Sequence, residues 1–389
     1  MNDYYVDIGY KSIHHFGEEL CGDHVDVVRN GADTTIVLAD GLGSGVQASI
    51  LSTLTARIIS TMVASGLSLE DCVETIASTL PVSKEKGVAY STFTIIHVLN
   101  NEVAELIQYD NPDIIFIRDG AVTDYRKTEL NVGGKKIFKS TIYLMEDDVF
   151  VAMSDGCPYA SDKPAYNYAW GPKQIAEFME MLVIAGYTTR NLSTMLVDEC
   201  YKLYGEHARD DVTACVVKVK KRVPVNLMFG PPSNRNDADK MVSLFLSKAG
   251  KHIVCGGTTA SIVAKWLRKP VNAKNNVEKT DIPPMSEIEG LDLVTEGVVT
   301  MNRVVEYAKD YIGANDRYEE WSMKRDGASR IARMLFEEAT DVNLFVGKAI
   351  NPAHQDPNMP FHFIFKMKLV EELEDALKKL GKTVRVSYF

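Results

Sequence analysis

Five aspartates in the first 211 residues stand at the ends of apolar segments, where their carboxylates could converge on one site. Three of these segments also have glycine beside the aspartate. Glycine allows close backbone approach and leaves its own carbonyl accessible as a ligand. The residues are Asp23 after Gly22, Asp40 before Gly41, Asp155 before Gly156, and the adjacent pair Asp210 and Asp211.

These residue types indicate divalent-cation chemistry. Converging carboxylates repel one another unless a cation lies between them. Oxygen ligands without His or Cys nearby suit Mg²⁺ or Mn²⁺ better than Zn²⁺. A single Asp-Gly pair is also a common turn, and we interpret Asp119-Gly120 as a plain hairpin turn. Asp40 and Asp155 differ from it because each ends a strongly apolar segment.

The elements that must position these carboxylates are predicted to form an antiparallel core covered by helices. Short turns such as LNNE and RDGA join apolar runs into hairpins. Helices fall in pairs among these strands, which argues against a parallel βαβ order. The predicted strands are 23–28, 34–39, 90–99, 103–109, 114–118, 149–153 and 212–220, and the predicted helices are 46–65, 68–79, 172–185 and 189–204.

The sequence around these aspartates resembles a known enzyme family. The motifs VLADGLGSG, AMSDG and RDDVT, in this order, resemble the metal-dependent type-2C (PPM) serine/threonine protein phosphatases. The segments CGD and NPDIIFIRDG bring the resemblance closer to the bacterial SpoIIE-type branch. It covers roughly residues 3–221 and implies an αββα sandwich with two divalent cations, Mn²⁺ or Mg²⁺.

The resemblance also implies roles for individual residues. Asp40 would bridge the two metals, and the backbone carbonyl of Gly41 would bind one of them. Asp155 and Asp210 would bind the other metal. Asp23 would hold metal-bound waters, directly or through a second layer of contacts.

Some positions depart from the wider family. Asp211 stands where many relatives have Asn, so it would orient the site or bind metal. Leu42 replaces the His that eukaryotic members carry after Asp-Gly, and no Arg precedes Asp23 to bind phosphate. The phosphate-binding and general-acid roles therefore have no assigned residue. Cys157 lacks the CX₅R loop of cysteine phosphatases and is interpreted as a packing residue.

The implied activity is hydrolysis of phosphoserine or phosphothreonine by a water that two metals activate, without a covalent enzyme intermediate. The resemblance suggests a phosphorylated anti-anti-sigma-like signalling protein as substrate. In that branch the helices equivalent to 46–79 move and so assemble the metal site. The competing interpretation is a catalytically weak regulatory binding protein on a phosphatase fold.

Composition limits the partners and the compartment. The 389 residues contain 43 Lys and Arg against 53 Asp and Glu, and this net charge of −10 disfavours nucleic acid. No apolar run approaches the roughly 20 residues of a membrane span, and the N-terminus does not resemble a signal peptide. The six scattered cysteines form no CxxC pair, so the expected compartment is the cytoplasm.

The chain after Arg222 is predicted to be a separate, smaller α/β domain, residues 223–389. Apolar strands at 225–228, 252–255 and 342–346 each precede a loop and a helix-like segment, and a helix at 368–380 leads into the strand VRVSY. This alternation predicts some parallel pairing. A second break is considered at 269–284, where three prolines bracket a polar stretch.

The run HIVCGGTTASIVAKWL holds the candidate ligand site of this domain. Backbone N–H groups at a helix start favour anions, and the two glycines permit close approach. Two alternatives stay open. A threonine could simply cap the helix, or the domain could serve as a homodimer or partner-docking surface without a small ligand. The candidate residues are Gly256, Gly257, Thr258 and Thr259.

Overall fold

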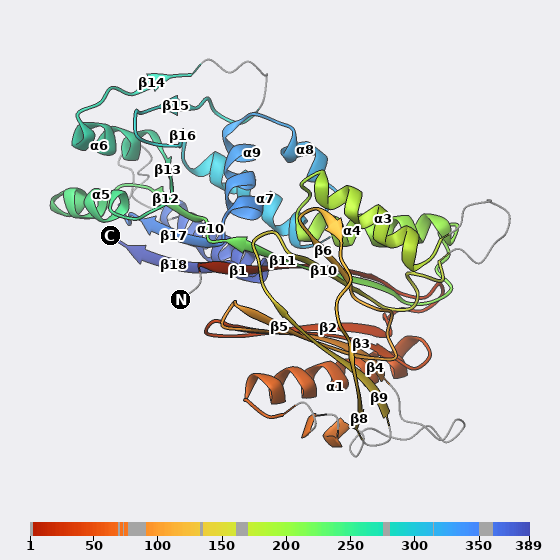
Figure 1. Cartoon of the computed structure of the whole chain (residues 1–389). Coiled ribbons are helices and arrows are strands. Elements are labelled where there is room, and N and C mark those ends of the chain that lie inside the picture. Colours follow the sequence, from red (N-terminus) through yellow and green to blue (C-terminus); the bar gives the residue numbers. More distant parts are fainter. Residues whose placement is uncertain are drawn as a thin grey trace. The chain divides into compact units, whose positions relative to one another are not determined.

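The computed structural model describes residues 3–68, 71–72, 74–76, 91–132, 135–160, 170–274, 281–313, 315–349 and 361–389. The chain divides into two compact units, Met1–Lys221 and Arg222–Phe389. We call them the N-terminal and the C-terminal unit and describe each by itself (Figure 1).

The N-terminal unit contains two antiparallel sheets. The first has the strand order β1-β11-β10-β6-β7, and the second has the order β2-β3-β4-β5-β9-β8. The first sheet consists of β1 (Tyr4–Ile13), β6 (Ile115–Arg118), β7 (Ala121–Val122), β10 (Val149–Met153) and β11 (Val212–Lys221). The second consists of β2 (Asp23–Asn30), β3 (Asp33–Gly41), β4 (Ser91–Leu99), β5 (Val103–Tyr109), β8 (Thr128–Val132) and β9 (Lys135–Tyr143).

The two sheets pack face to face, with α1 on the outer face of one and α3 and α4 on the outer face of the other (Figure 1). Strand β3 shows how alternation builds these layers. Ile36 and Leu38 join the core between the sheets, whereas Val37 and Ala39 pack with residues of α1. The predicted αββα sandwich is therefore confirmed. The helices are α1 (Gly45–Ala64), α3 (Pro172–Ile184) and α4 (Thr189–Leu203).

Two features of this unit differ from the sequence expectations. Strands β1, β8 and β9 were not predicted, because polar residues interrupt their apolar alternation. By length and hydropathy alone, α1 could span a membrane. Its apolar character has another explanation, since Ala56 and Ile59 of α1 are fully buried against the second sheet. Half of the helix predicted at 68–79 lies outside the described residues, and residues 71–72 and 74–76 are helical.

The C-terminal unit is an α/β fold around one seven-stranded sheet, as expected, and it does not divide at 269–284. The strand order is β14-β15-β16-β13-β12-β17-β18, and the last five strands in this order are parallel. These strands are β12 (Pro224–Phe229), β13 (Lys251–Cys255), β14 (Asn272–Ala273), β15 (Ser286–Glu287), β16 (Leu293–Thr295), β17 (Asp341–Val346) and β18 (Thr383–Tyr388).

Helices cover both faces of this sheet. Helices α5 and α6 pack with Met228 and Val254 on one face. Helices α7, α9 and α10 pack with Leu227 and Ile253 on the other. The helices are α5 (Ala238–Leu246), α6 (Gly257–Leu267), α7 (Val298–Ile312), α8 (Tyr318–Ser322), α9 (Gly327–Ala332) and α10 (Phe361–Lys379), with short helical turns at Arg235–Asp237 and Arg333–Glu338.

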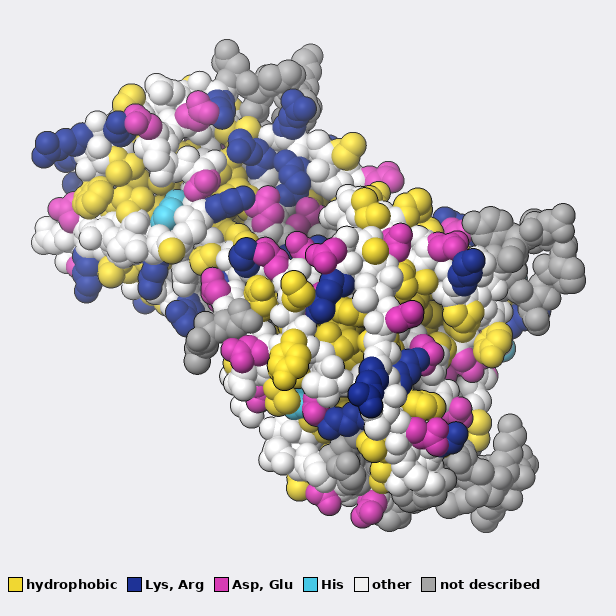
Figure 2. Space-filling view, viewed as in Figure 1, with side chains coloured by type: hydrophobic (Ala, Val, Ile, Leu, Met, Phe, Trp, Pro, Cys, Tyr) yellow, Lys and Arg dark blue, Asp and Glu magenta, His cyan; other side chains and the backbone are white. Residues whose placement is uncertain are grey.

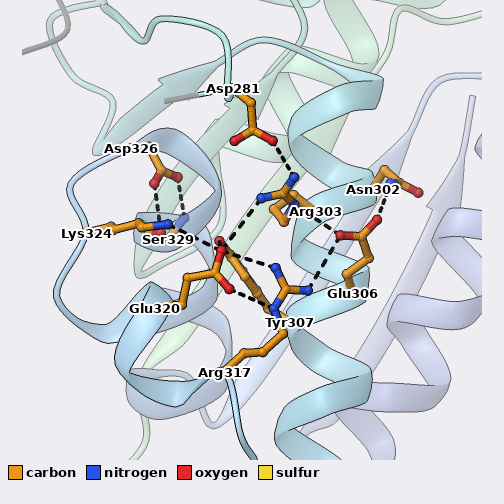
Figure 3. A network of polar contacts seen from close by, with 10 residues as sticks. All are labelled: Asp281, Asn302, Arg303, Glu306, Tyr307, Arg317, Glu320, Lys324, Asp326 and Ser329. Carbon is orange, nitrogen blue, oxygen red and sulfur yellow. Dashed lines mark hydrogen bonds and ion pairs between the residues drawn. The ribbon is translucent and has the colours of Figure 1, made fainter. Parts of the chain in front are cut away.

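A network of charged side chains joins α7 to α8 (Figure 3). Arg317 Nε donates to Glu320 Oε2 at 2.7 Å, and Arg303 on α7 pairs with Asp281 at 2.5 Å. The hydrogen bond from Arg317 lowers the pKa of Glu320 to about 2. The Arg317 guanidinium also lies over the ring of Tyr307, 4.9 Å from its centroid. These charges are mutually satisfied, so we interpret the network as structural.

Candidate functional site

The second sheet of the N-terminal unit contributes two of the predicted aspartates. Asp23 begins β2, and Asp40 is the penultimate residue of β3. The two strands are antiparallel, and their register places Asp23 directly opposite Asp40. Directly opposed residues have Cβ atoms about 4.5–5.5 Å apart, so these two carboxylates are neighbours.

The first sheet contributes the other three. Strand β10 runs antiparallel to β11 with Met153 opposite Ala214, so the end of β10 lies beside the start of β11. Asp155 therefore comes near Asp210 and Asp211. Within the pair, the N–H of Asp211 donates to Asp210 Oδ1 at 2.9 Å.

The ends of the two sheets meet at these carboxylates. A Cβ added to Gly22, the residue before β2, would lie 2.5 Å from Asp211 Oδ2. The charge of Asp211 also acts on both Asp23 and Asp40. The structure thus brings together all five aspartates that the sequence singled out.

Glycine is required in these motifs because neighbouring backbone occupies the place of a side chain. A Cβ on Gly41 would overlap the carbonyl of Ala48 in α1. A Cβ on Gly156 would overlap the carbonyl of Asp211. The glycines therefore let α1 and the loop before β11 approach the strand ends that carry Asp40 and Asp155.

The electrostatics of the cluster are those of crowded, partly buried carboxylates. Burial, together with the charges of Asp23, Asp155, Asp210 and Asp211, raises the pKa of Asp40 to about 9. Burial also raises the pKa of Asp23 to about 7 and that of Asp210 to about 6. Among the causes of these three shifts, the charge of His15 lowers the pKa of Asp210, whereas burial and neighbouring carboxylates raise all three pKa values.

Both carboxylate oxygens of Asp23 and Oδ2 of Asp211 are buried and make no hydrogen bond of good geometry in the described part of the chain. Ser154 and Thr213 nevertheless lie near enough to Asp23 to offset part of the rise in its pKa. Unpaired buried carboxylate oxygens are costly unless a cation binds them. The donor set, with oxygen atoms only, fits Mg²⁺ or Mn²⁺. Among the described residues, however, no three His, Cys, Asp or Glu side chains are already gathered closely enough to hold a metal ion.

Residues that the sequence analysis did not single out support the cluster. The backbone N–H of His15 donates to Asp211 Oδ1 at 3.0 Å, which fixes one oxygen of that carboxylate. Predicting strand β1 would have placed His15, since Ile13 pairs with Val212 and brings His15 to the start of β11. Without β1 in the prediction, His15 could not be placed there.

Asn111 of the NPD segment supports the aspartate cluster without belonging to it. Thr92 lies opposite Asp40 on β4, and its hydroxyl donates to Asn111 Oδ1 at 2.5 Å. The amide of Asn111 donates in turn to Thr94 Oγ1 at 3.2 Å. Asn111 therefore fixes the strand next to Asp40.

The two remaining positions agree with the sequence interpretation. Leu42, where eukaryotic relatives have His, is partly exposed and offers no polar group. Cys157 is fully buried, and its hydrogen bond with Cys200 and its burial keep the pKa of its thiol well above the usual range. A thiol of this kind is a poor nucleophile.

Comparison with known proteins assigns part of the chain to a family. Residues 30–220 match the family model of Stage II sporulation protein E (SpoIIE). Residues 30–220 therefore form a SpoIIE-type domain. No curated protein sequence matches the chain significantly.

Solved structures similar to the chain include the phosphatase domain of the cell fate determinant SpoIIE from Bacillus subtilis. The two are 20% identical over 58% of this chain and 96% of that one, with a TM-score of 0.44. The RsbU and RsbW domains of a Mycobacterium tuberculosis protein are 15% identical over 62% of this chain and 70% of theirs, with a TM-score of 0.47. RsbX in complex with magnesium is 17% identical over 57% of this chain and 98% of its own, with a TM-score of 0.41.

Gly156→Ala should damage the SpoIIE-type domain although it adds only one methyl group. The new Cβ would overlap the Asp211 carbonyl, so the loop that carries Asp210 and Asp211 must shift. We expect a loss of about 1–3 kcal/mol in the free energy of unfolding, measured by urea denaturation. Gly171→Ala is the control, because a Cβ there would have 3.7 Å of clearance. Equal stability of the two variants would contradict the account of these glycines.

Asp23→Asn should stabilise the metal-free protein, and increasingly so at high pH. The folded-state pKa of Asp23 is raised to about 7, so stability is lost as the pH rises from about 4 through 7 and this carboxyl ionises. In EDTA, we expect the variant to gain on the order of 2 kcal/mol over wild type at pH 8.5 and less at pH 5. Urea denaturation at both pH values measures this, and a gain independent of pH would refute it.

Proposed function

We propose that the SpoIIE-type domain hydrolyses phosphoserine or phosphothreonine esters in a protein substrate, with divalent cations held by its aspartates. The main support is one observation, the convergence of five carboxylates from strand ends of two sheets, with oxygens of Asp23 and Asp211 buried and unpaired. The match of residues 30–220 to the SpoIIE family supports the same reaction class.

The residues that would hold two cations, Mn²⁺ or Mg²⁺, are Asp40, Gly41 through its carbonyl, Asp155 and Asp210. Asp23 would hold coordinated waters. Divalent cations bound there supply a Lewis acid that lowers the pKa of water toward neutrality and neutralises phosphoryl oxygens.

The charge of the aspartate side chains affects whether a phosphoester can bind. Uncompensated carboxylates repel a phosphate dianion, so the protein alone disfavours substrate at this site. His15 fixes Asp211 through its backbone N–H, and Thr92 and Asn111 fix the strand beside Asp40. Cys157 is fully buried and so is not the nucleophile, which agrees with attack by water.

For the substrate, we propose a phosphorylated anti-anti-sigma-like signalling protein, and for the compartment the cytoplasm. The substrate proposal rests on the motifs shared with the SpoIIE-type branch. The acidic composition agrees with a protein rather than a nucleic acid as partner. On the face shown in Figure 2, basic side chains are interspersed with acidic ones, which also agrees with a protein rather than a nucleic acid as partner.

A second candidate is a catalytically weak regulatory protein that binds a phosphoprotein or partner on the same fold. One observation favours it: in the described part of the chain, no three potential ligands are gathered into a ready metal site. The two candidates differ in turnover, which an assay measures directly.

Phosphate release from p-nitrophenyl phosphate and from a phosphoserine peptide should require Mn²⁺ or Mg²⁺. We expect Asp40→Asn and Asp155→Asn each to lower the rate by about 100-fold or more, because each removes one of the proposed cation ligands. Asp119→Asn is the matched control, since Asp119 lies in the β6–β7 turn with a φ of 52° that Asn also adopts.

Control and wild-type rates should be equal. A folded wild-type protein with no metal-dependent turnover would favour the regulatory candidate. Activity that survives both Asn substitutions would overturn the proposed role of the aspartates.

A further inference from the structure

The parallel strands of the C-terminal unit reverse their order at one point of the sheet. From β12 the chain moves outward to β13 and β16 on one side, then returns to add β17 and β18 on the other. Helices α5 and α6 pack on one face, whereas α7 and α10 pack on the opposite face (Figure 1). In open α/β sheets, a crevice forms at such a reversal, outside the carboxyl ends of the two central strands. Here these strands are β12 and β17.

A buried lysine lies at the carboxyl ends of these two strands. Lys366 of α10 is 7% exposed, and its Nζ donates to the carbonyl of Gly347, directly after β17. The same ammonium lies 5.2 Å from the ring centroid of Phe229, the last residue of β12. A Cβ on Gly230 would collide with Nζ, so the ammonium fills the space that this glycine leaves.

Lys366 forms no ion pair with any described carboxylate, and the carbonyl of Gly347 is a single neutral acceptor for three donors. Burying an ammonium without a counter-charge is unfavourable. Burial accordingly lowers the pKa of Lys366 to about 8, which leaves it mostly charged at neutral pH. A bound anion would supply the missing charge.

Loops with glycine continue from this lysine along the carboxyl edge, by which we mean the side of the sheet where β12, β13, β16 and β17 end. The N–H of Gly347 donates to the carbonyl of Phe229 at 3.1 Å, and the N–H of Gly256 donates to that of Thr295 at 2.8 Å. A Cβ on Gly297 would lie 3.5 Å from Gly256 and 4.0 Å from the Phe229 ring. The ring of Phe229 therefore lies near both Lys366 and the Gly297 loop beside the start of α6.

The start of α6 lacks a side-chain cap. Gly256 is the N-cap residue, with a φ of 110°, so the alternative that a threonine caps this helix is wrong. Thr259, in the first turn, is 1% exposed, and its Oγ1 has no hydrogen-bond partner among the described residues. This hydroxyl lies 3.3 Å from the place of a Cβ on Gly256, at the start of the helix. An uncapped helix start with a buried, unpaired hydroxyl suits an external ligand.

Glu296 limits which ligands could bind at the start of α6. Its exposed carboxylate lies 3.6 Å from the place of a Cβ on Gly257 and would repel a bare anion at the start of α6. A carboxylate accepts hydrogen bonds, so hydroxyl groups suit the surroundings of Glu296 and an anion suits those of Lys366. The combination describes a phosphate ester of a polyhydroxylated molecule.

A surface pocket of about 190 Å³, lined in part by Lys251, Arg333 and Glu338, is a weaker candidate. Lys251 and Glu338 form an ion pair at 2.5 Å, and Arg333 donates to three backbone carbonyls. Lys251 and Arg333 are therefore better satisfied than Lys366, which donates to a single carbonyl.

We propose that the C-terminal unit binds a phosphate ester that carries hydroxyl groups, of the nucleotide or sugar phosphate class, at its carboxyl edge. The phosphate lies on Lys366, and hydroxyls lie toward Glu296 and Thr259. This gives the predicted ligand site at Gly256, Gly257, Thr258 and Thr259 a chemical class and adds Lys366, which the sequence did not single out. It does not depend on phosphatase activity.

The test is calorimetric titration of the full chain with ADP, NAD⁺, glucose 6-phosphate and inorganic phosphate. At least one of the three esters should bind, and more tightly than inorganic phosphate. Lys366→Met should weaken this binding by about tenfold or more, because it removes a charge-assisted contact. Gly257→Asp should do the same by adding a negative charge at the start of α6.

Lys378→Met is the matched control, since Lys378 lies on the same helix but is exposed and paired with Glu374. Lys366→Met replaces a buried cation with an apolar side chain, so we expect it to fold, which circular dichroism checks. The proposal is overturned if none of the three esters binds the wild-type chain. It is equally overturned if folded Lys366→Met and Gly257→Asp bind as tightly as Lys378→Met.

Discussion

Electrostatic repulsion between aspartates at the joined ends of two sheets is the constraint on which the N-terminal unit depends. Folding places Asp23 opposite Asp40 in one sheet and brings Asp155 beside the loop before β11 in the other. The packing of the sandwich must offset the unfavourable energy of this arrangement. Natural proteins retain such destabilising clusters at functional sites, where a ligand relieves them.

The scaffold meets this constraint through close backbone contacts rather than through neutralising side chains. Gly41 lets α1 approach the end of β3, and Gly156 lets the backbone of Asp211 approach the end of β10. The backbone N–H of His15 satisfies one oxygen of Asp211, and the charge of His15 offsets part of the rise in the pKa of Asp210. When its carboxyls ionise, the cluster is negative, which favours divalent cations over a phosphate ester as its first ligand.

Much of this architecture could be predicted from local sequence pattern. Apolar runs such as 103–109 and 149–153 coincide with β5 and β10, and the turn at Asp119-Gly120 joins β6 to β7. The aspartates were predicted because each follows or precedes such a run. In contrast, β1 pairs with β11 across some 200 residues of chain, and its polar residues hide its alternation. The contact between His15 and Asp211 could not be predicted for that reason.

In the C-terminal unit, too, the contacts that depend on long-range strand pairing could not be predicted. Glycines and threonines at 256–259 are recognisable in sequence, but a lysine in a predicted helix is ordinarily expected to reach solvent. Lys366 is buried because its ammonium reaches Gly347 after β17 and the Phe229 ring at the end of β12, two strands that meet where the sheet reverses its order. Strand order is a property of long-range pairing, so the residues that meet at its reversal could not be read from local pattern.

The central claim is that the aspartate cluster is a cation site, and direct Mn²⁺ titration followed by electron paramagnetic resonance tests it most directly. The account predicts saturable binding with a dissociation constant nearer millimolar than nanomolar, because carboxylates that are partly open to solvent hold such ions loosely. Binding should be lost in Asp40→Asn and kept in Asp119→Asn. Absence of bound Mn²⁺ in the wild-type protein, or undiminished binding in Asp40→Asn, would contradict the claim.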